Sequence, residues 1–360
     1  MRNFLRHFKR LHLWLLLDLI LLALFFLLRR ERSLMNALSS TVSMPLERAL
    51  GRVWAYVPFS GAELCYILAG VFLVWYFFFA IRRVARAEYK GEEVYRRLLV
   101  LLNLLLSLYA AFCLLWGVNF YTDDFCSQSI YPEPVAYDDL IAVTRLFAEE
   151  TAQRAGTVAR DEKGVYAVPR AESMAKASTL YENLYGEFPF LYIPVDPQPK
   201  PVFFSRVMSA MNVTGLYFPF TGESNLNMDF PAATFPFTVA HELAHRRGIA
   251  SEQQCNFLGT LAAICSDDPA YQYSGWLTGY IHLSNALYTV DPEAVTEIRA
   301  SLPIEVEADL YAASAYWARY EGRVSAASGR AYDAMLKSYG DKLGMKSYGA
   351  VVDLLVAYFK

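Results

Sequence analysis

Three long apolar runs mark the first third of the chain, at residues 11–28, 62–81 and 98–118. Each is long enough to cross a bilayer as a helix that rises about 1.5 Å per residue. Charged or turn-forming residues bound every run. The pattern predicts a membrane anchor over residues 1–119 that contains three transmembrane helices.

The first run also has the position of a signal peptide. Its apolar stretch is long, Arg29 and Arg30 follow it directly, and no cleavage site of small residues stands at its end, so we interpret it as an anchor. Asp18 interrupts this run. A carboxylate within a span is either functional or faces the helix bundle, and we favour a bundle-facing Asp18 paired with a neighbouring arginine.

Lys and Arg are concentrated before the first run and between the second and third runs. Short cytoplasmic segments are enriched in these residues, so both segments are expected inside the cell. Three crossings then place residues 120–360 outside the cytoplasm. The longer loop at residues 29–61 carries five arginines, which opposes this orientation.

The second part of the chain has the pattern of a folded, α-rich domain. Apolar residues recur at helical spacing in three segments, residues 137–155, 171–185 and 236–360. A region rich in Pro, Gly and aromatic residues precedes the last segment and contains strand-like runs at residues 201–204 and 215–220. The sequence therefore predicts an α-rich α+β fold, in which three transmembrane helices precede a domain over residues 120–360.

Composition agrees with this division, because 55% of all residues are apolar. Residues 1–97 hold 15 Lys and Arg against 7 Asp and Glu, whereas residues 98–360 hold 18 against 29. The positive charge flanks apolar runs instead of forming a face of a folded domain, which argues against nucleic acid as a partner. Five scattered cysteines without a CxxC pair argue against a disulfide framework, although one bridge through Cys126 is left open.

A His-Glu-Leu-Ala-His motif spans His241, Glu242 and His245 on a predicted helix. The spacing of four places both imidazoles on one helical face, where they can bind one zinc ion while Glu242 faces the water on the metal. Short motifs of this kind occur by chance. Here, however, the chain has only five histidines, two of them lie before or at the start of the first apolar run, and the motif uses two of the other three.

Zinc bound by two histidines needs a third protein ligand. Gly248 is expected to end the motif helix, and a turn there would bring Glu252, in the first turn of a helix capped by Ser251, back to the metal. Asn256 lies one turn later and is expected to orient an imidazole. The alternatives are a Glu252 that only stabilises a helix amino terminus and an Asn256 bonded to backbone.

The stretch from His241 to Asn256 resembles the gluzincin-type zinc metallopeptidases, which are zincins. In these proteins a second helix supplies a Glu ligand and, four residues later, a carboxylate, where this chain has Asn256. More closely, the chain resembles an uncharacterised bacterial membrane-protein family, a domain of unknown function, that combines a three-span anchor with this motif. The stretches that carry this resemblance are residues 215–225, 241–245, 273–275 and 346–349. Gln253, Gln254 and Cys255 depart from the expected pattern.

The resemblance implies a zincin-like domain in which an edge strand above the motif helix binds extended peptide. Residues 215–225 are the candidate strand and following loop, with Gly215 and Tyr217 as candidate substrate-binding residues. Glu223 is either a group that binds the metal or a substrate amine or a loop carboxylate that faces water, and we favour the second interpretation. The oxyanion of a tetrahedral intermediate needs a donor, for which His282 competes with Tyr273 and Tyr280.

Motif and resemblance together predict a zinc metallopeptidase in the bacterial cell membrane, with several spans and an extracytoplasmic catalytic domain. It would hydrolyse peptide bonds of an unknown protein substrate, with one Zn²⁺ held by His241, His245 and Glu252 and with Glu242 as general base. The expected partners are the lipid bilayer and that substrate. The alternative is a catalytically inactive zincin-fold scaffold. An intramembrane protease is disfavoured, because the motif lies more than a hundred residues beyond the last apolar run.

Overall fold

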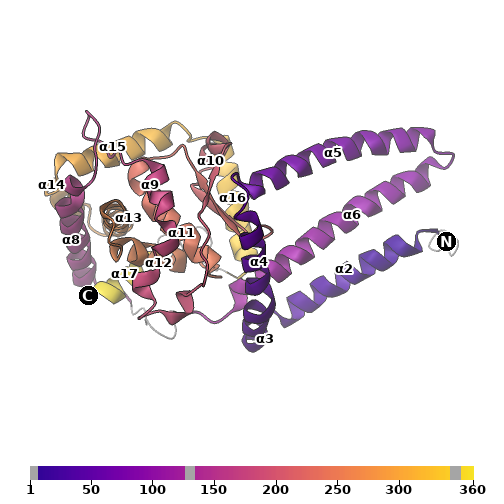
Figure 1. Ribbon diagram of the computed structural model, residues 1–360, viewed down its shortest axis with the longest axis horizontal. Coiled ribbons are helices and arrows are strands. Elements are labelled where there is room, and N and C mark those ends of the chain that lie inside the picture. The colour runs from indigo at the N-terminus through magenta and orange to yellow at the C-terminus, as the bar shows by residue number, and fades with distance from the viewer. Residues whose placement is uncertain (1–6, 126–133, 341–349) are drawn as a thin grey trace.

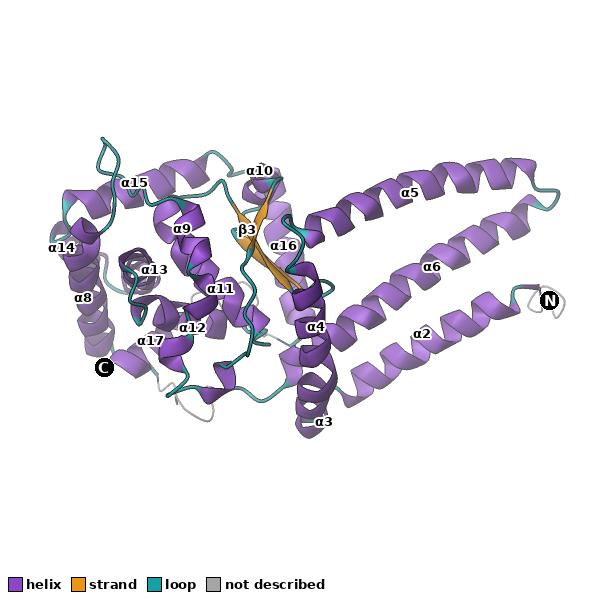
Figure 2. Ribbon diagram, in the orientation of Figure 1, coloured by secondary structure: helices purple, strands orange, loops and turns teal. Residues whose placement is uncertain are grey.

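The computed structural model describes residues 7–125, 134–340 and 350–360. The chain is mostly helical, with one small sheet (Figures 1 and 2). Within these ranges all four cysteines are free thiols. Cys126 and the stretch at residues 346–349 lie outside the described residues.

Three apolar helices project together from one side of the globular part (Figure 1). They are α2 (Lys9–Leu28), α5 (Gly61–Arg86) and α6 (Lys90–Leu115), and each is long and apolar enough to cross a membrane. This confirms the three expected apolar helices. The last two are longer than their apolar runs, because the charged residues between the runs continue both helices and leave only a short turn.

Asp18 on α2 faces the bundle, but its partner is a serine. Ser107 on α6 donates to both carboxylate oxygens of Asp18, at 3.0 and 2.9 Å, and accepts from the indole of Trp14 at 2.8 Å. The expected arginine partner was therefore wrong. Asp18 helps to hold α2 against α6.

The loop between α2 and α5 is helical and lies across the ends of the three apolar helices (Figure 1). It comprises α3 (Arg32–Leu38), the π-helical turn η1 (Ser39–Ser43) and α4 (Met44–Trp54). A Cβ at Gly51 would lie 2.8 Å from the carbonyl oxygen of Gly222, so α4 packs directly on the globular part. Gly222 has a φ of +65°, and a Cβ there would lie 2.1 Å from the carbonyl oxygen of Glu47, so both its conformation and this contact favour glycine.

The globular part surrounds α11 and α12 with other helices. Its helices are α8 (Tyr137–Arg154), α9 (Arg170–Ala175), α10 (Ser205–Ala210), α11 (Phe235–Arg246), α12 (Glu252–Ile264), α13 (Pro269–Tyr288), α14 (Pro292–Ala300), α15 (Ile304–Ala318), α16 (Arg323–Ser338) and α17 (Val351–Phe359). The helix expected over residues 171–185 is correct only as far as α9. Beyond it, short 3₁₀ turns place Ala177, Leu180 and Leu184 in the core. A spacing of three residues suits 3₁₀ turns as well as α-helix, so the pattern did not separate them.

The sheet has three short strands, β1 (Lys200–Val202), β2 (Gly215–Phe218) and β3 (Glu223–Asn227). The order is β1-β3-β2, with β3 parallel to β1 and antiparallel to β2. β2 is therefore an edge strand, as expected, whereas every residue of β3 is buried.

The start of α5 is attached to the central strand. Ser60 donates to the side-chain oxygen of Asn225 at 2.6 Å, and the backbone N–H of Gly61 donates to Glu223 at 3.0 Å. Glu223 is thus a buried strand residue, and the expectation of a loop carboxylate facing water was wrong. Burial raises the pKa of this carboxyl above its usual range.

Candidate metal centre

The motif lies on α11, a helix buried along its whole length. Pro236 occupies the first turn, where no backbone donor is required. His241 and His245 lie one turn apart on the same face, with ring centroids 4.9 Å apart. The helix therefore presents both imidazoles to one point, as predicted.

Gly248 reverses the chain after α11. Its φ of +86° is favourable only for glycine, and its N–H donates to the carbonyl of His245 at 2.8 Å. The side chain of Met44 packs against it, since a Cβ at Gly248 would lie 2.7 Å from that sulfur. Ser251 is the N-cap of α12, although its side chain makes no capping hydrogen bond. Glu252 is consequently the first residue of a helix that faces the motif.

The turn brings the carboxylate of Glu252 to both imidazoles. The Nε2 atoms of His241 and His245 lie 3.2 and 3.6 Å from its two oxygens. Two atoms that each lie about 2.1 Å from one tetrahedral zinc ion are roughly 3.4 Å apart. All three side chains are buried, and one potential ligand atom from each lies within 4.8 Å of the others. The spacing and the donor types therefore fit a zinc site.

The charges of this cluster are coupled. Burial opposes ionisation of Glu252, but the adjacent imidazoles hold its pKa well below the usual range. Burial also opposes protonation of His245, but Cys255 and Glu252 raise its pKa well above the usual range. The carboxylate is thus anionic in a buried place, where a cation stabilises it. Within the described part of the chain, one oxygen of Glu242 is buried without a hydrogen-bond partner, so it is available to a water molecule or an ion.

Glu242 lies beside the edge strand. Burial raises the pKa of its carboxyl, and the neighbouring histidines oppose that shift. A Cβ at Gly215 would lie 2.4 to 2.6 Å from atoms of the Glu242 side chain. Ser224 on β3 donates to the backbone carbonyl of Glu242 at 2.9 Å, which holds the sheet against α11. Gly215 is thus placed at the candidate general base.

Tyr217 lies in a wall of the site and is buried. Its hydroxyl donates to Glu47 of α4 at 3.1 Å, and its ring centroid lies 5.0 Å from that of Trp116. The Trp116 ring in turn lies edge-on to the imidazole of His245, with centroids 5.8 Å apart. These are packing contacts, and the substrate-binding role expected for Tyr217 remains a prediction.

The second nitrogen of His245 is oriented by the turn after α11. Its Nδ1 lies 2.8 Å from the carbonyl oxygen of Ile249 and 3.3 Å from the sulfur of Cys255. Asn256 is buried, and in the described ranges its amide nitrogen has no hydrogen-bond partner. A backbone carbonyl thus orients His245, and the orienting role expected for Asn256 remains a prediction.

His282 on α13 lies near the motif. Its ring centroid is 6.4 Å from that of Phe237, which is 6.2 Å from that of His241. Burial, with a smaller contribution from His241, lowers the pKa of His282 to about 4. Its imidazole is therefore neutral near pH 7 and retains one N–H donor.

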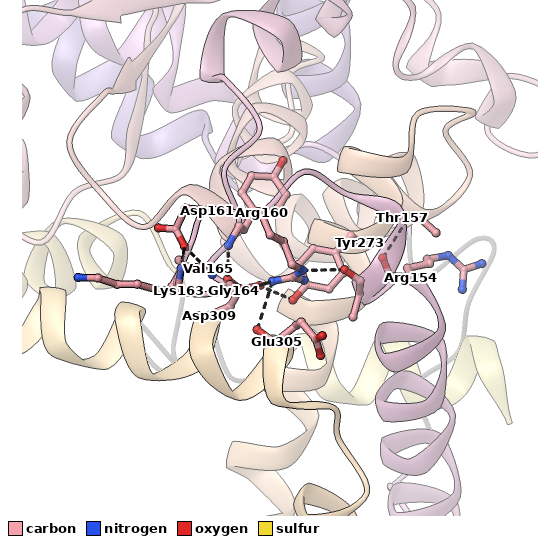
Figure 3. A network of polar contacts seen from close by, with 12 residues as sticks. Arg154, Thr157, Arg160, Asp161, Lys163, Gly164, Val165, Tyr273, Glu305 and Asp309 are labelled. Carbon is pink, nitrogen blue, oxygen red and sulfur yellow. Dashed lines mark hydrogen bonds and ion pairs between the residues drawn. The ribbon is translucent and has the colours of Figure 1, made fainter.

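The two competing tyrosines on α13 are engaged elsewhere. The hydroxyl of Tyr273 donates to the buried carboxylate of Asp309 on α15, which also binds Arg160 at 3.1 Å (Figure 3). Asp309 accepts in addition from the backbone of Tyr166 at 2.7 Å. Tyr280 is buried and interacts with Ser284. These contacts favour His282 among the three candidates.

Two contacts of the site were not found from the sequence. The hydroxyl of Tyr332 on α16 donates to Glu252, from 80 positions along the chain, and Trp116 packs on His245 from the end of α6. With 25 tyrosines in the chain, nothing distinguished Tyr332. A tryptophan at the end of an apolar run is typical of a membrane interface, and that pattern gave no indication that Trp116 also packs on His245.

Fold and site define a mostly helical protein with three amino-terminal apolar helices and a buried His-His-Glu cluster. The chain belongs to a family described as "Protein of unknown function (DUF3810)", whose model matches residues 39–356. The match covers α4, α5, α6 and the whole metal cluster. No curated protein and no solved structure matches the chain.

Proposed function

We propose that this protein is a membrane-anchored zinc metallopeptidase with a zincin-like globular domain. The observation that carries the proposal is the convergence of His241, His245 and Glu252, with the carboxylate of Glu242 one residue along the same helix. Two imidazoles and one carboxylate leave a fourth position open, as catalytic zinc sites do. When bound, the zinc ion supplies a Lewis acid that makes water acidic near neutral pH.

The chain's own groups fit the remaining tasks of peptide hydrolysis. Glu242 accepts the proton of the attacking water and passes it to the leaving amine, a task for which a carboxyl of raised pKa is suited. The edge strand β2 offers backbone groups to an extended peptide, and the absence of a side chain at Gly215 keeps that strand close to Glu242. The neutral His282 supplies a hydrogen-bond donor.

The test is zinc content and peptide turnover of the full-length chain in detergent. The intact chain is expected to hold about one zinc ion, because three protein ligands bind catalytic zinc tightly. His241→Ala should lose the metal, and His12→Ala, a histidine on α2, should keep it. Full zinc content in His241→Ala would disprove this placement. Zinc without turnover of a broad peptide library would favour the inactive scaffold instead.

The proposed orientation places the globular part outside the cytoplasm. A reporter that is active only outside should give a signal when fused after Lys360 and none when inserted at Tyr89, in the turn between α5 and α6. The reverse pattern would overturn the orientation but not the metal site.

A further inference from the structure

We infer that the metal centre lies at the bilayer surface and acts on polypeptide segments that emerge directly from a membrane-spanning helix. The location follows from contacts between the spans and the site. The action on such segments rests on the proposed peptidase function. Membrane-embedded polypeptides with an extended segment next to the span are therefore the inferred substrate class.

The end of the last span touches a metal ligand. Trp116 follows the final residue of α6, Leu115, and its ring lies 5.8 Å from that of His245. The apolar part of α6 begins after Arg97 and covers roughly 27 Å to Leu115, at about 1.5 Å per residue. That length is close to the hydrocarbon thickness of a bilayer, about 30 Å. Trp116 is thus at the membrane interface, where tryptophan is enriched. The imidazole of His245 packs on the Trp116 ring and therefore lies close to this interface.

The segment between α2 and α5 exposes large apolar side chains. Leu46 and Val53 of α4 are 45% and 67% exposed, and Tyr56 and Phe59, which precede α5, are 91% and 52% exposed. The segment runs across the ends of the spans (Figure 2). Several large exposed apolar side chains within one short segment are typical of a surface that contacts a membrane or a partner. Their continuity with the start of α5 identifies the bilayer as the occupant.

A second apolar group lies on the globular part. Phe203 is 87% exposed and its neighbour Phe204 is 49% exposed. The carboxylate of Glu63, in the first turn of α5, accepts from the backbone N–H groups of both, at 2.9 and 2.8 Å. Val207 on α10 extends this surface. Because Glu63 belongs to the start of a span, these phenylalanines are fixed at the level where the chain enters the bilayer.

This placement determines which peptides reach the site. A segment in extended form advances about 3.3 Å per residue, so a short stretch beyond a span reaches a site that lies at the membrane surface. A substrate anchored in the same membrane has an effective concentration far above that of the same peptide in solution. Cleavage close to the membrane surface is the expected outcome.

The first experiment measures depth by spin-label accessibility in the full-length chain in nanodiscs. Labels are placed by Phe203→Cys and, as a control, by Val290→Cys next to α14, at the end of the globular part remote from the spans (Figure 1). Cys65, Cys126 and Cys265 are replaced by Ser. Collisions with oxygen, which partitions into lipid, should dominate the relaxation of the label at 203. Collisions with an aqueous nickel chelate should dominate at 290. Equal nickel accessibility at both positions would overturn the location.

The second experiment compares one random-sequence library in two forms in liposomes. In one form the peptide follows a single transmembrane helix, and in the other it is free in solution. The anchored form should be cleaved at least about 100-fold faster, on the scale of tethering effects. A helical spacer of about 20 residues, which moves the library roughly 30 Å outward, should abolish most of the gain. Glu242→Gln provides the background rate.

The outcomes separate this inference from the function on which it rests. Equal cleavage of free and anchored libraries would contradict the inferred substrate class and leave the peptidase in place. No cleavage of either form by zinc-loaded chain would contradict the peptidase, while the spin-label result would still decide where the site lies.

Discussion

The backbone of Gly215 lies against the carboxylate of Glu242, so closely that a Cβ on the strand would be 2.4 Å from Oε1. Real Cβ atoms do not approach other atoms to this distance. The edge strand and the motif helix thus come together only because position 215 has no side chain. This contact joins the candidate peptide-binding strand to the candidate general base.

Gly215→Ala should displace either β2 or the Glu242 side chain. We expect a loss of stability of about 1 to 3 kcal/mol, as for overpacking elsewhere, and a larger loss of peptide turnover, with zinc content unchanged. Zinc analysis, thermal unfolding and turnover on the same sample provide the measurement. Gly329→Ala on α16, where a Cβ meets no atom within 4 Å, is the matched control. Unaltered turnover in Gly215→Ala would show that the close approach has no role.

Glu242 and Glu252 should separate by role. Glu242→Gln cannot accept a proton, so zinc should remain while turnover falls by about two to four orders of magnitude, the range for general-base loss. Glu252→Gln removes an anionic ligand, so zinc affinity should fall first and excess zinc should restore part of the activity. A Glu252 that only stabilises the start of α12 would lower the unfolding free energy by roughly 0.3 to 1 kcal/mol and keep the metal. Zinc titration of both variants distinguishes the two roles.

The sequence predicted those parts of the structure that depend on local spacing. Three apolar runs, the pairing of His241 with His245 on one face, and the reversal at Gly248 all follow from periodicity and backbone preference. The position of Glu252 beside the two histidines followed from the same turn. Long-range contacts carry no such signal. Tyr332 reaches Glu252, and Glu47 reaches Tyr217, only because elements far apart in the sequence pack together.

The loop between α2 and α5 shows the same limit. Its five arginines opposed the predicted orientation, and the helical segment that it forms is fixed by contact with the globular part. The backbone contact of Gly51 with Gly222 and the contact of the Met44 side chain with Gly248 are close approaches that only the folded chain reveals. Similarly, the sequence around Glu223 is typical of a loop. Only the folded chain shows that the N–H of Gly61, at the start of α5, donates to its carboxylate.

Tyr332→Phe should weaken zinc binding without removing a ligand. The hydroxyl donates to Glu252 and so restrains the carboxylate that faces both histidines. Loss of such an outer contact typically costs 10- to 100-fold in metal affinity, so we expect a change of about that size. Competition with a zinc chelator measures it. Tyr311→Phe, an exposed tyrosine on α15, should leave the affinity unchanged. Equal affinities for both variants would exclude a restraining role for Tyr332.

Glu47 should make stability depend on pH. Burial raises the pKa of its carboxyl well above the usual range, and the hydrogen bond from Tyr217 opposes this only in part. The folded chain therefore binds the proton more tightly than the unfolded chain, so the contribution of Glu47 to the unfolding free energy falls as pH rises from about 4.5 through the raised pKa. Glu47→Gln keeps an acceptor for Tyr217 and has no proton to lose. Its melting temperature should exceed that of the wild type at pH 8, and the difference should shrink at pH 5.

Thermal unfolding of the full-length chain in detergent at both pH values measures this, with the exposed Glu293→Gln as the control. If the melting temperature of Glu47→Gln falls from pH 5 to pH 8 by as much as that of the wild type, Glu47 is not the titrating group.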